Sequence, residues 1–184
     1  MPFAAVLDAS VLYPLPLRDT LLRVAESELF IPYWSEQILS EVTRNLIDDG
    51  RATPVQARNL TNAMREAFDA ATITEDVIAQ LEPAMTNDPK DRHVLAAAVA
   101  SDAHAVVTLN LEHFPVAACD AVGVEPLNPD VFLIEMYRLD EDAVRAALER
   151  QRAALRSPPL QLNQLLDRLA VTVPRFATMV RSAT

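Results

Sequence analysis

Runs of apolar residues along the chain predict a small number of buried β-strands. Residues 3–7 form a short, continuous apolar run, as expected for a strand that is covered on both faces, and the mostly apolar residues 105–109 predict a second buried strand. Weaker strand signals occur at residues 29–31, which Pro32 closes, and at residues 123–125. The sequence therefore predicts two strong strands and two weak ones, well separated along the chain.

Helical periodicity fills the segments between these strands. Apolar residues recur every three or four positions in residues 19–25, 35–49, 53–71, 74–81 and 88–99. Ser35, Thr53 and Asp88 are residue types that begin helices, the last two followed by proline, and Gly50 is typical of a helix end. Strands that alternate with helices indicate an α/β fold with a mostly parallel sheet.

The last part of the chain has a different pattern. Strand signals stop after Pro126, whereas residues 130–156 and 162–181 show helical periodicity. We therefore predict an α/β domain over residues 1–126 and an all-helical extension over residues 127–184.

Composition narrows the classes of protein to consider. Of 184 residues, 51% are hydrophobic, which is enough for a sizeable core. Only two glycines occur, which excludes phosphate-binding loops built from several glycines. The single Cys119 excludes an internal disulfide, so we expect a cytoplasmic protein. No cationic segment precedes the first strand, and the longest apolar run, residues 94–100, is too short to cross a membrane.

The charge balance is acidic and uneven. A net charge of −10 argues against a nucleic-acid-binding protein, whose surface is usually basic. Residues 140–184 hold 7 arginines and 5 acidic residues, so they carry +2 and leave −12 for residues 1–139. The excess of acidic residues therefore lies in the part of the chain that contains the predicted sheet.

Several acidic and polar residues fall near the predicted carboxyl ends of the strands, where parallel sheets bind ligands. Asp8 follows the first strand, Glu41 lies within the helix at residues 35–49, and Asp91 lies at the start of a later helix. Other polar residues near these positions are Ser10, Asp88, Thr108, Asn110 and Glu112. From spacing alone, helix capping by Asp88 or Asp91 and a solvated Glu41 remain open.

Convergence of these acids would require a cation. Two carboxylates 4 Å apart repel by about 4 kcal/mol at an effective dielectric constant of 20, so a bound ion must offset the repulsion. Oxygen ligands without a cysteine or histidine cluster suit Mg²⁺ or Mn²⁺. Such an ion can activate water for attack on a phosphodiester.

Four blocks, in their order along the chain, resemble the PIN-domain family. They are Leu7-Asp-Ala-Ser10, Ser40-Glu-Val-Thr-Arg-Asn-Leu46, Asn87-Asp-Pro-Lys-Asp91-Arg-His-Val-Leu-Ala-Ala-Ala98 and Val107-Thr-Leu-Asn-Leu-Glu-His-Phe114. Within the family, the sequence is most similar to VapC-like ribonuclease toxins of bacterial toxin–antitoxin pairs, some of which carry a C-terminal helical extension. The resemblance implies a three-layer α/β/α domain with a central, mostly parallel sheet.

The resemblance also implies the roles of individual residues. Asp8, Glu41 and Asp91 occupy the positions of the catalytic, metal-binding acids, and Ser10 and Thr108 occupy positions that support them. The implied activity is hydrolysis of RNA phosphodiester bonds with Mg²⁺ or Mn²⁺. Asp8 and Asp91 would hold the cation, while Glu41 would position the ion or the attacking water.

One departure from the family pattern leaves an alternative open. Asn110 stands where many PIN domains have an aspartate, and a neutral amide contributes less to holding a second cation. Asp88 or Glu112 could compensate. The alternatives are a catalytically inactive PIN-fold module that binds RNA or protein, and a Mg²⁺-dependent phosphatase, although Ser10 stands where such phosphatases have a second aspartate.

Basic residues and partners complete the expectation. Three basic residues beside the acidic motifs are predicted to contact the RNA backbone: Arg44, Lys90 and Arg92. The mechanism requires no histidine as a base, so we expect His93, His104 and His113 to be structural or solvated. The resemblance further implies a protein antitoxin as partner and a homodimer.

Overall fold

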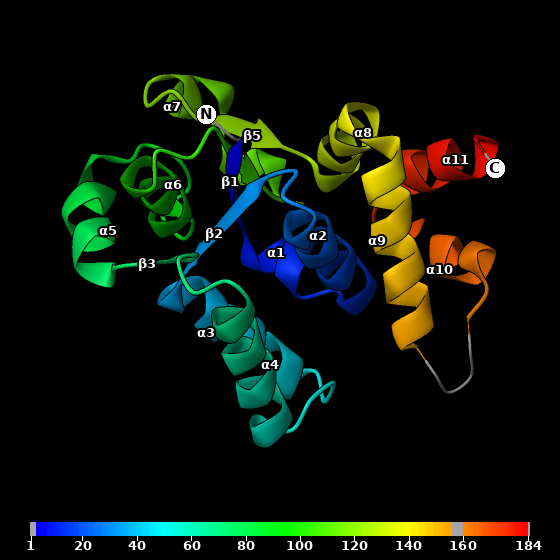
Figure 1. The fold of residues 1–184 in the computed structure, drawn as a ribbon. Coiled ribbons are helices and arrows are strands. Elements are labelled where there is room, and N and C mark those ends of the chain that lie inside the picture. Colours follow the sequence, from blue (N-terminus) through cyan, green and yellow to red (C-terminus); the bar gives the residue numbers. More distant parts are fainter. Residues whose placement is uncertain (1–2, 156–159, 184) are drawn as a thin grey trace.

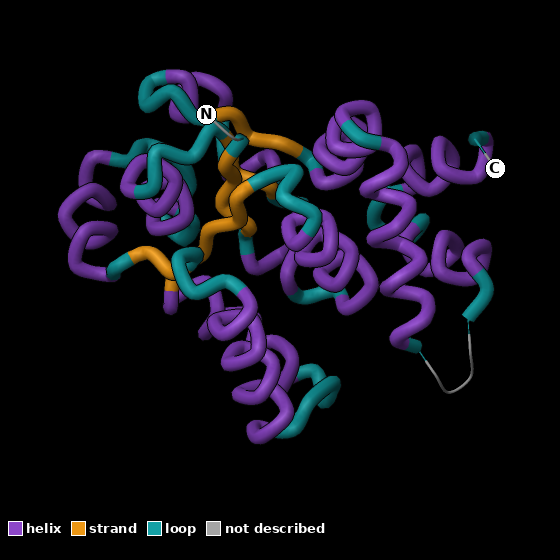
Figure 2. Tube along the Cα trace, in the orientation of Figure 1, coloured by secondary structure: helices purple, strands orange, loops and turns teal. Residues whose placement is uncertain are grey.

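A single five-stranded sheet lies at the centre of the α/β part of the chain (Figures 1 and 2). The computed structural model describes residues 3–155 and 160–183, and within them the strands follow the order β3-β2-β1-β4-β5, all parallel. The strands are β1 (Ala4–Leu7), β2 (Ile31–Ser35), β3 (Thr72–Ile73), β4 (Ala105–Val107) and β5 (Glu125–Leu127). The predicted α/β fold with a parallel sheet is confirmed.

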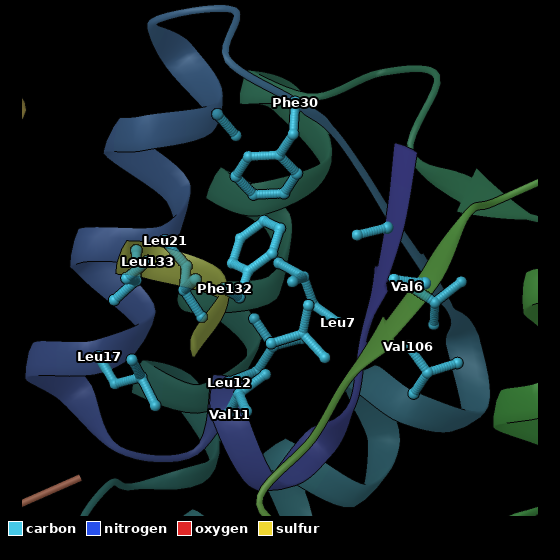
Figure 3. Close-up of a cluster of buried hydrophobic side chains, with 14 of the residues drawn as sticks. Val6, Leu7, Val11, Leu12, Leu17, Leu21, Phe30, Val106, Phe132 and Leu133 are labelled. Atoms are coloured by element: carbon cyan, nitrogen blue, oxygen red, sulfur yellow. The ribbon is translucent and has the colours of Figure 1, made fainter. Parts of the chain in front are cut away.

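Apolar side chains cover both faces of this sheet, which explains why β1 is a continuous apolar run. All four residues of β1 are buried. Figure 3 shows Leu7 on the side of α2 (Leu15–Glu26), near Leu17 and Leu21, whereas Val6 lies on the other side of the strand. On that other face, α6 (Arg92–Ala100) packs against β1, β2 and β4 (Figure 1).

The remaining helices of the α/β part connect the strands. They are α1 (Ala9–Leu12), α3 (Glu36–Asp48), α4 (Pro54–Ala67), α5 (Glu75–Leu81) and α7 (Val116–Asp120), with 3₁₀ turns η1 (Glu82–Ala84) and η2 (Leu111–His113). As predicted, Ser35 and Thr53 cap α3 and α4 through hydrogen bonds from backbone N–H groups, and Gly50 ends α3 with a φ of 65°. Helices α3 and α4 form a hairpin that extends from the sheet (Figure 1).

The strand predicted at residues 29–31 is displaced, because Pro32 lies inside β2 rather than closing it. The N–H of Ile31 donates to the carbonyl of Phe3 beside β1, so the nitrogen of the next residue faces away from β1. On that side β3 pairs with β2 only from Trp34 onward. Proline therefore costs no ladder hydrogen bond at this position.

Other boundaries also differ from the prediction. The helix expected at residues 19–25 begins at Leu15, and the strand expected at residues 123–125 forms two residues later, as β5. The helix expected over residues 130–156 is divided at Asp140, whose Oδ1 accepts the N–H of Ala143. The short elements α1 and β3 were not predicted.

The C-terminal helices pack onto the α/β part (Figure 1). They are α8 (Pro129–Leu139), α9 (Glu141–Ala154), α10 (Leu162–Leu169) and α11 (Pro174–Ser182). The ring of Phe132 in α8 lies edge-on to Phe30, with centroids 4.8 Å apart, and Figure 3 shows it close to Leu7. Helix α9 lies along α2, where the buried Thr20 Oγ1 donates to Gln151 Oε1 (2.7 Å).

One apolar core therefore runs from the sheet into the C-terminal helices. The predicted all-helical character of this part is confirmed. Residues 156–159, which include the end of the helix expected over residues 130–156, lie outside the described residues. The division between residues 126 and 127 stays a prediction. In the described part of the chain, no helix has the length and apolarity needed to cross a bilayer.

Candidate active site

Asp8 lies at the carboxyl end of β1, where two hydroxyl groups hold its carboxylate. The residue is only 2% exposed. Its Oδ2 accepts hydrogen bonds from Ser10 Oγ (2.6 Å) and Thr108 Oγ1 (2.7 Å). The N–H groups of Leu109 and Asn110 donate to these hydroxyl oxygens, both at 3.0 Å. Each hydroxyl hydrogen is thus directed toward Asp8, and the two donors replace part of the water that the carboxylate lost on burial.

A turn precedes α6 and sets the position of Asp91. The Oδ1 of Asp88 accepts the N–H of Lys90 (2.9 Å), and the N–H of Asp91 donates to the carbonyl of Asp88 (2.9 Å). Helix α6 consequently begins at Arg92, with Asp91 at the N-cap position. The expectation that the helix starts at residue 88 is wrong, because Asp88 closes the turn instead of capping the helix.

The carboxylate of Asp91 is held by a histidine. Its Oδ2 lies 2.6 Å from Nδ1 of His113, and its side chain is 14% exposed. Burial raises the pKa of Asp91 and the negative charge of Asp8 raises it further, which together outweigh the lowering by the His113 hydrogen bond. The hydrogen bond to Asp91 raises the pKa of His113. Asp8 and Asp91 are therefore close enough to interact electrostatically.

Glu41 in α3 faces the same helix. Its Oε1 lies 3.1 Å from Nε2 of His93, which is 1% exposed and lies in the first turn of α6. Burial alone lowers the pKa of His93, but the carboxylates of Glu41, Asp91 and Glu82 outweigh burial and raise it. Because Glu41 and Asp91 act on one imidazole, both acids lie at the same end of α6.

The structure places Asp8 directly after β1, and both Glu41 and Asp91 beside the first turn of α6. Asp8, Glu41 and Asp91 each have one carboxylate oxygen next to a protein group. Within the described residues, the second oxygen of each makes no hydrogen bond or ion pair. Ligand atoms of Asp88, Asp91 and His113 also lie within 4.8 Å of one another. Asp8 and Glu41 do not belong to this group of described residues. Carboxylate oxygens that lack a protein partner suit a hard divalent cation.

Two further polar residues lie in the loop after β4. The N–H of Asn110 contacts Thr108, as described, and its side chain makes no hydrogen bond within residues 3–155 and 160–183. The side chain of Glu112 is 73% exposed, and its Oε1 lies 3.9 Å from Nε2 of His113. The structure gives Glu112 no contact with the three acids, in contrast to Ser10 and Thr108.

The three basic residues that are predicted to contact RNA make few hydrogen bonds or ion pairs with other described residues. The side chains of Arg44 and Lys90 are exposed and form no hydrogen bond or ion pair with other described residues. Arg92 is half-buried, and its Nε donates to the carbonyl of Asn87 (3.4 Å). Arg44 and Lys90 are therefore free to contact a ligand.

The contacts of two histidines with the acids were not predicted. His93 and His113 both lie inside the PIN-like blocks, but their spacing does not reveal which face of the chain they occupy. Proximity to Asp91 and Asn110 in those blocks was the available signal. His104 has the expected structural role, since its Nδ1 accepts the N–H of Ala4 (3.1 Å) and its ring stacks on Phe3.

Comparison with known proteins defines the class. A family model described as PIN domain matches residues 4–112, more than half of the chain, so the chain belongs to the PIN-domain family. A second family model, described as VapC50 C-terminal domain, matches residues 129–182.

A curated relative shares part of this sequence. The chain is 44% identical over 98 residues to the Mycobacterium tuberculosis protein named "Putative ribonuclease VapC50". The match covers 53% of this chain and 58% of that relative, so it spans little more than half of each. No solved structure matches the chain.

Proposed function

We propose that the protein is an endoribonuclease that hydrolyses RNA phosphodiester bonds with the help of Mg²⁺ or Mn²⁺. The observation that carries the proposal is that Asp8, Glu41 and Asp91 each have one carboxylate oxygen next to a protein group, while the second oxygen makes no hydrogen bond or ion pair within the described residues. The name of the Mycobacterium tuberculosis relative, which describes a ribonuclease, supports the same activity.

We assign two roles to the residues of the site: some bind the cation, and others orient its ligands. Asp8 and Asp91 would hold the cation, and Glu41 would position the ion or the attacking water. Ser10 and Thr108 fix the carboxylate of Asp8. When bound, a divalent cation supplies activation of water and stabilisation of charge on the phosphate.

Other polar residues adjust this arrangement. Asn110 cannot add a negative charge, so we propose that one cation binds firmly and that a second depends on the phosphate of the substrate. Asp88 lies beside Asp91 and is the better candidate to compensate for the missing charge, because Glu112 points into solvent. The proposed role of Arg44, Lys90 and Arg92 is contact with the RNA backbone rather than with the reacting atoms.

The proposal extends to partners. We propose that the protein is the toxin of a toxin–antitoxin pair, neutralised by a protein antitoxin, and that it forms a homodimer. Residues 1–126 would form the nuclease domain and residues 127–184 the helical extension. Support comes from the match of the C-terminal residues to the VapC50 C-terminal domain. We also propose a cytoplasmic location, which the single cysteine and hence the lack of an internal disulfide support.

Cleavage of RNA by the purified full chain tests this function. Wild type and Asp8→Asn are incubated with a labelled RNA in Mn²⁺, in Mg²⁺ and with a chelator, and a phosphomonoester is offered in parallel. The proposal expects metal-dependent RNA cleavage that Asp8→Asn loses, and no phosphomonoester hydrolysis. Equal cleavage by both proteins would indicate contamination, and no cleavage by wild type would favour an inactive binding module. Hydrolysis of the phosphomonoester alone would favour a phosphatase.

A further inference from the structure

The contact between His113 and Asp91 links the loop after β4 to the N-terminal turn of α6. Nδ1 of His113 lies 2.6 Å from Oδ2 of Asp91, a short distance for a nitrogen–oxygen pair. An ionised carboxylate can only accept, so Nδ1 must carry the hydrogen. This holds whether or not the other ring nitrogen is protonated. His113 is therefore a fixed hydrogen-bond donor to one oxygen of Asp91.

Backbone hydrogen bonds prevent His113 from swinging away. The N–H of Asp88 donates to the carbonyl of His113 (3.1 Å), and the N–H of His113 donates to the carbonyl of Asn110 (2.9 Å). The next residue, Phe114, is 1% exposed and anchors the loop in the core. The donor is thus held in place before any ligand binds, which lowers the entropic cost of keeping Asp91 in one orientation.

The same loop also serves the neighbouring acid. Thr108, at its start, donates to Oδ2 of Asp8, and His113, near its end, donates to Oδ2 of Asp91. By contrast, Nε2 of His113 makes no hydrogen bond within the described residues, and its ion-pair contact there is with Glu112, at 3.9 Å. The ring therefore acts on the site through Nδ1.

We propose that His113 is a positioning residue of the metal site: its Nδ1–H holds one oxygen of Asp91 and leaves the other oxygen available to the cation. The inference rests on the proposed metal-dependent function of the same site. Partners of metal ligands commonly change metal affinity by about 10–100-fold when they are removed. His113 would thus be a fourth residue on which cation binding depends.

Substitutions that move or remove the donor test the proposal. His113→Asn places an amide nitrogen at the position of Nδ1, His113→Gln places one near Nε2, and His113→Leu removes the donor. Affinity for Mn²⁺ is measured by isothermal titration calorimetry on the full chain, with His104→Asn as a matched control at a histidine outside the site. We expect a loss of about tenfold or more in His113→Leu and His113→Gln, and less than about threefold in His113→Asn and the control.

Two outcomes would overturn the proposal. Wild-type affinity in His113→Leu would show that the donor is not needed, and equal losses in His113→Asn and His113→Leu would show that packing, not donation, matters. If His113→Leu does not fold, the proposal is tested by comparing the Mn²⁺ affinities of His113→Asn and His113→Gln. Equal affinities of these two variants would overturn it.

The outcomes also separate this inference from the proposed function. If Asp8→Asn loses Mn²⁺ binding while His113→Leu retains it, only the positioning role fails. If the Mn²⁺ affinities follow the expected order but wild type cleaves no RNA, the proposed function fails and the role of His113 stands.

Discussion

A carboxylate as buried as Asp8 remains an anion at modest cost only when donors replace the lost water. Here two hydroxyl groups, from Ser10 and Thr108, supply this replacement at a single oxygen. Glu41 and Asp91 are each met by an imidazole instead. The proposed site is therefore organised by the neighbours of its acids as much as by the acids themselves.

Removing the hydroxyl of Thr108 tests this organisation. Thr108→Val keeps the shape of a side chain that is 0% exposed, but it leaves Asp8 with one donor fewer and the N–H of Asn110 without an acceptor. We expect the free energy of unfolding at pH 7 to fall by about 1–3 kcal/mol. Urea denaturation of the purified variant measures this change.

A second buried threonine provides the control. Thr61 donates only to carbonyls of its own helix, so Thr61→Val should lose less than about 1 kcal/mol. Equal losses in the two variants would contradict a special role for the Thr108 hydroxyl.

At the level of single residues, the sequence predicted the acids of the site better than the side chains that contact them. Asp8, Glu41 and Asp91 were expected from motifs that resemble a family, and their action at one cation site stays a prediction. The contacts of His93 and His113 could not be predicted, because they depend on where α3, α6 and the loop after β4 meet in space. Asp88 shows the same difficulty, since aspartate before proline suits both a helix cap and the turn that it forms.

Elements with strong local signals were predicted well. Helices α3 and α4 have caps that form at their predicted residues, Ser35 and Thr53. The two-residue β3 has no signal of its own, because it exists through pairing with Trp34 and Ser35 of β2. The strand prediction at Pro32 was wrong because a proline ends a strand only where its nitrogen faces a neighbouring strand. The sequence does not show which side of β2 has such a neighbour at this position. Short elements and strand edges are thus decided by tertiary pairing.

The hairpin of α3 and α4 carries a pH-dependent contact. Arg65 in α4 donates from Nε and Nη2 to the two carboxylate oxygens of Glu36 at the start of α3, at 2.9 and 2.6 Å. These hydrogen bonds lower the pKa of Glu36 below its ordinary value of 4.5. The contact therefore stabilises the fold at pH values above 4.5, and this stabilisation is lost as the pH falls through the lowered pKa.

Glu36→Gln should reveal this dependence. The side chains of Glu36 and Arg65 are 45% and 36% exposed, so the pair contributes about 0.5 kcal/mol. We expect the melting temperature of Glu36→Gln to lie about 1–2 °C below wild type at pH 7 and to equal wild type near pH 3. The exposed Glu66, in the same hairpin, supplies the control Glu66→Gln. A deficit that persists unchanged at pH 3 would rule out the charged pair as its cause.

Across the whole molecule, two features matter: a continuous core and an uneven charge. Residues 1–139, which contain the sheet and the acids of the proposed cation site, carry −12 of the charge, against +2 in residues 140–184. A bound divalent cation would reverse the sign of the local field that a phosphate encounters. The average charge of the chain is therefore a poor guide to its proposed substrate.

The continuous core predicts that the C-terminal helices and the sheet unfold together. Phe132→Ala removes a ring that is 1% exposed and packs against Phe30, which should lower the free energy of unfolding by about 3–5 kcal/mol. Fluorescence of Trp34, the single tryptophan, reports on the sheet, and far-ultraviolet circular dichroism reports on all helices. We expect both denaturation midpoints to shift together.

A change far from the core provides the comparison. Val171 is 85% exposed, so Val171→Ala should alter stability by less than about 0.5 kcal/mol. If Phe132→Ala moves the circular dichroism transition but leaves the Trp34 transition in place, the helices and the sheet are separate folding units.

The central claim is that Asp8, Glu41 and Asp91 act together on RNA through a divalent cation. Its most direct test is the rate of RNA cleavage in Mn²⁺ by Asp8→Asn, Glu41→Gln and Asp91→Asn, beside wild type and Asp76→Asn, which alters an exposed acid in α5. We predict losses of about 100-fold or more in all three site variants and none in Asp76→Asn. Wild-type rates in any of the three site variants would contradict the claim.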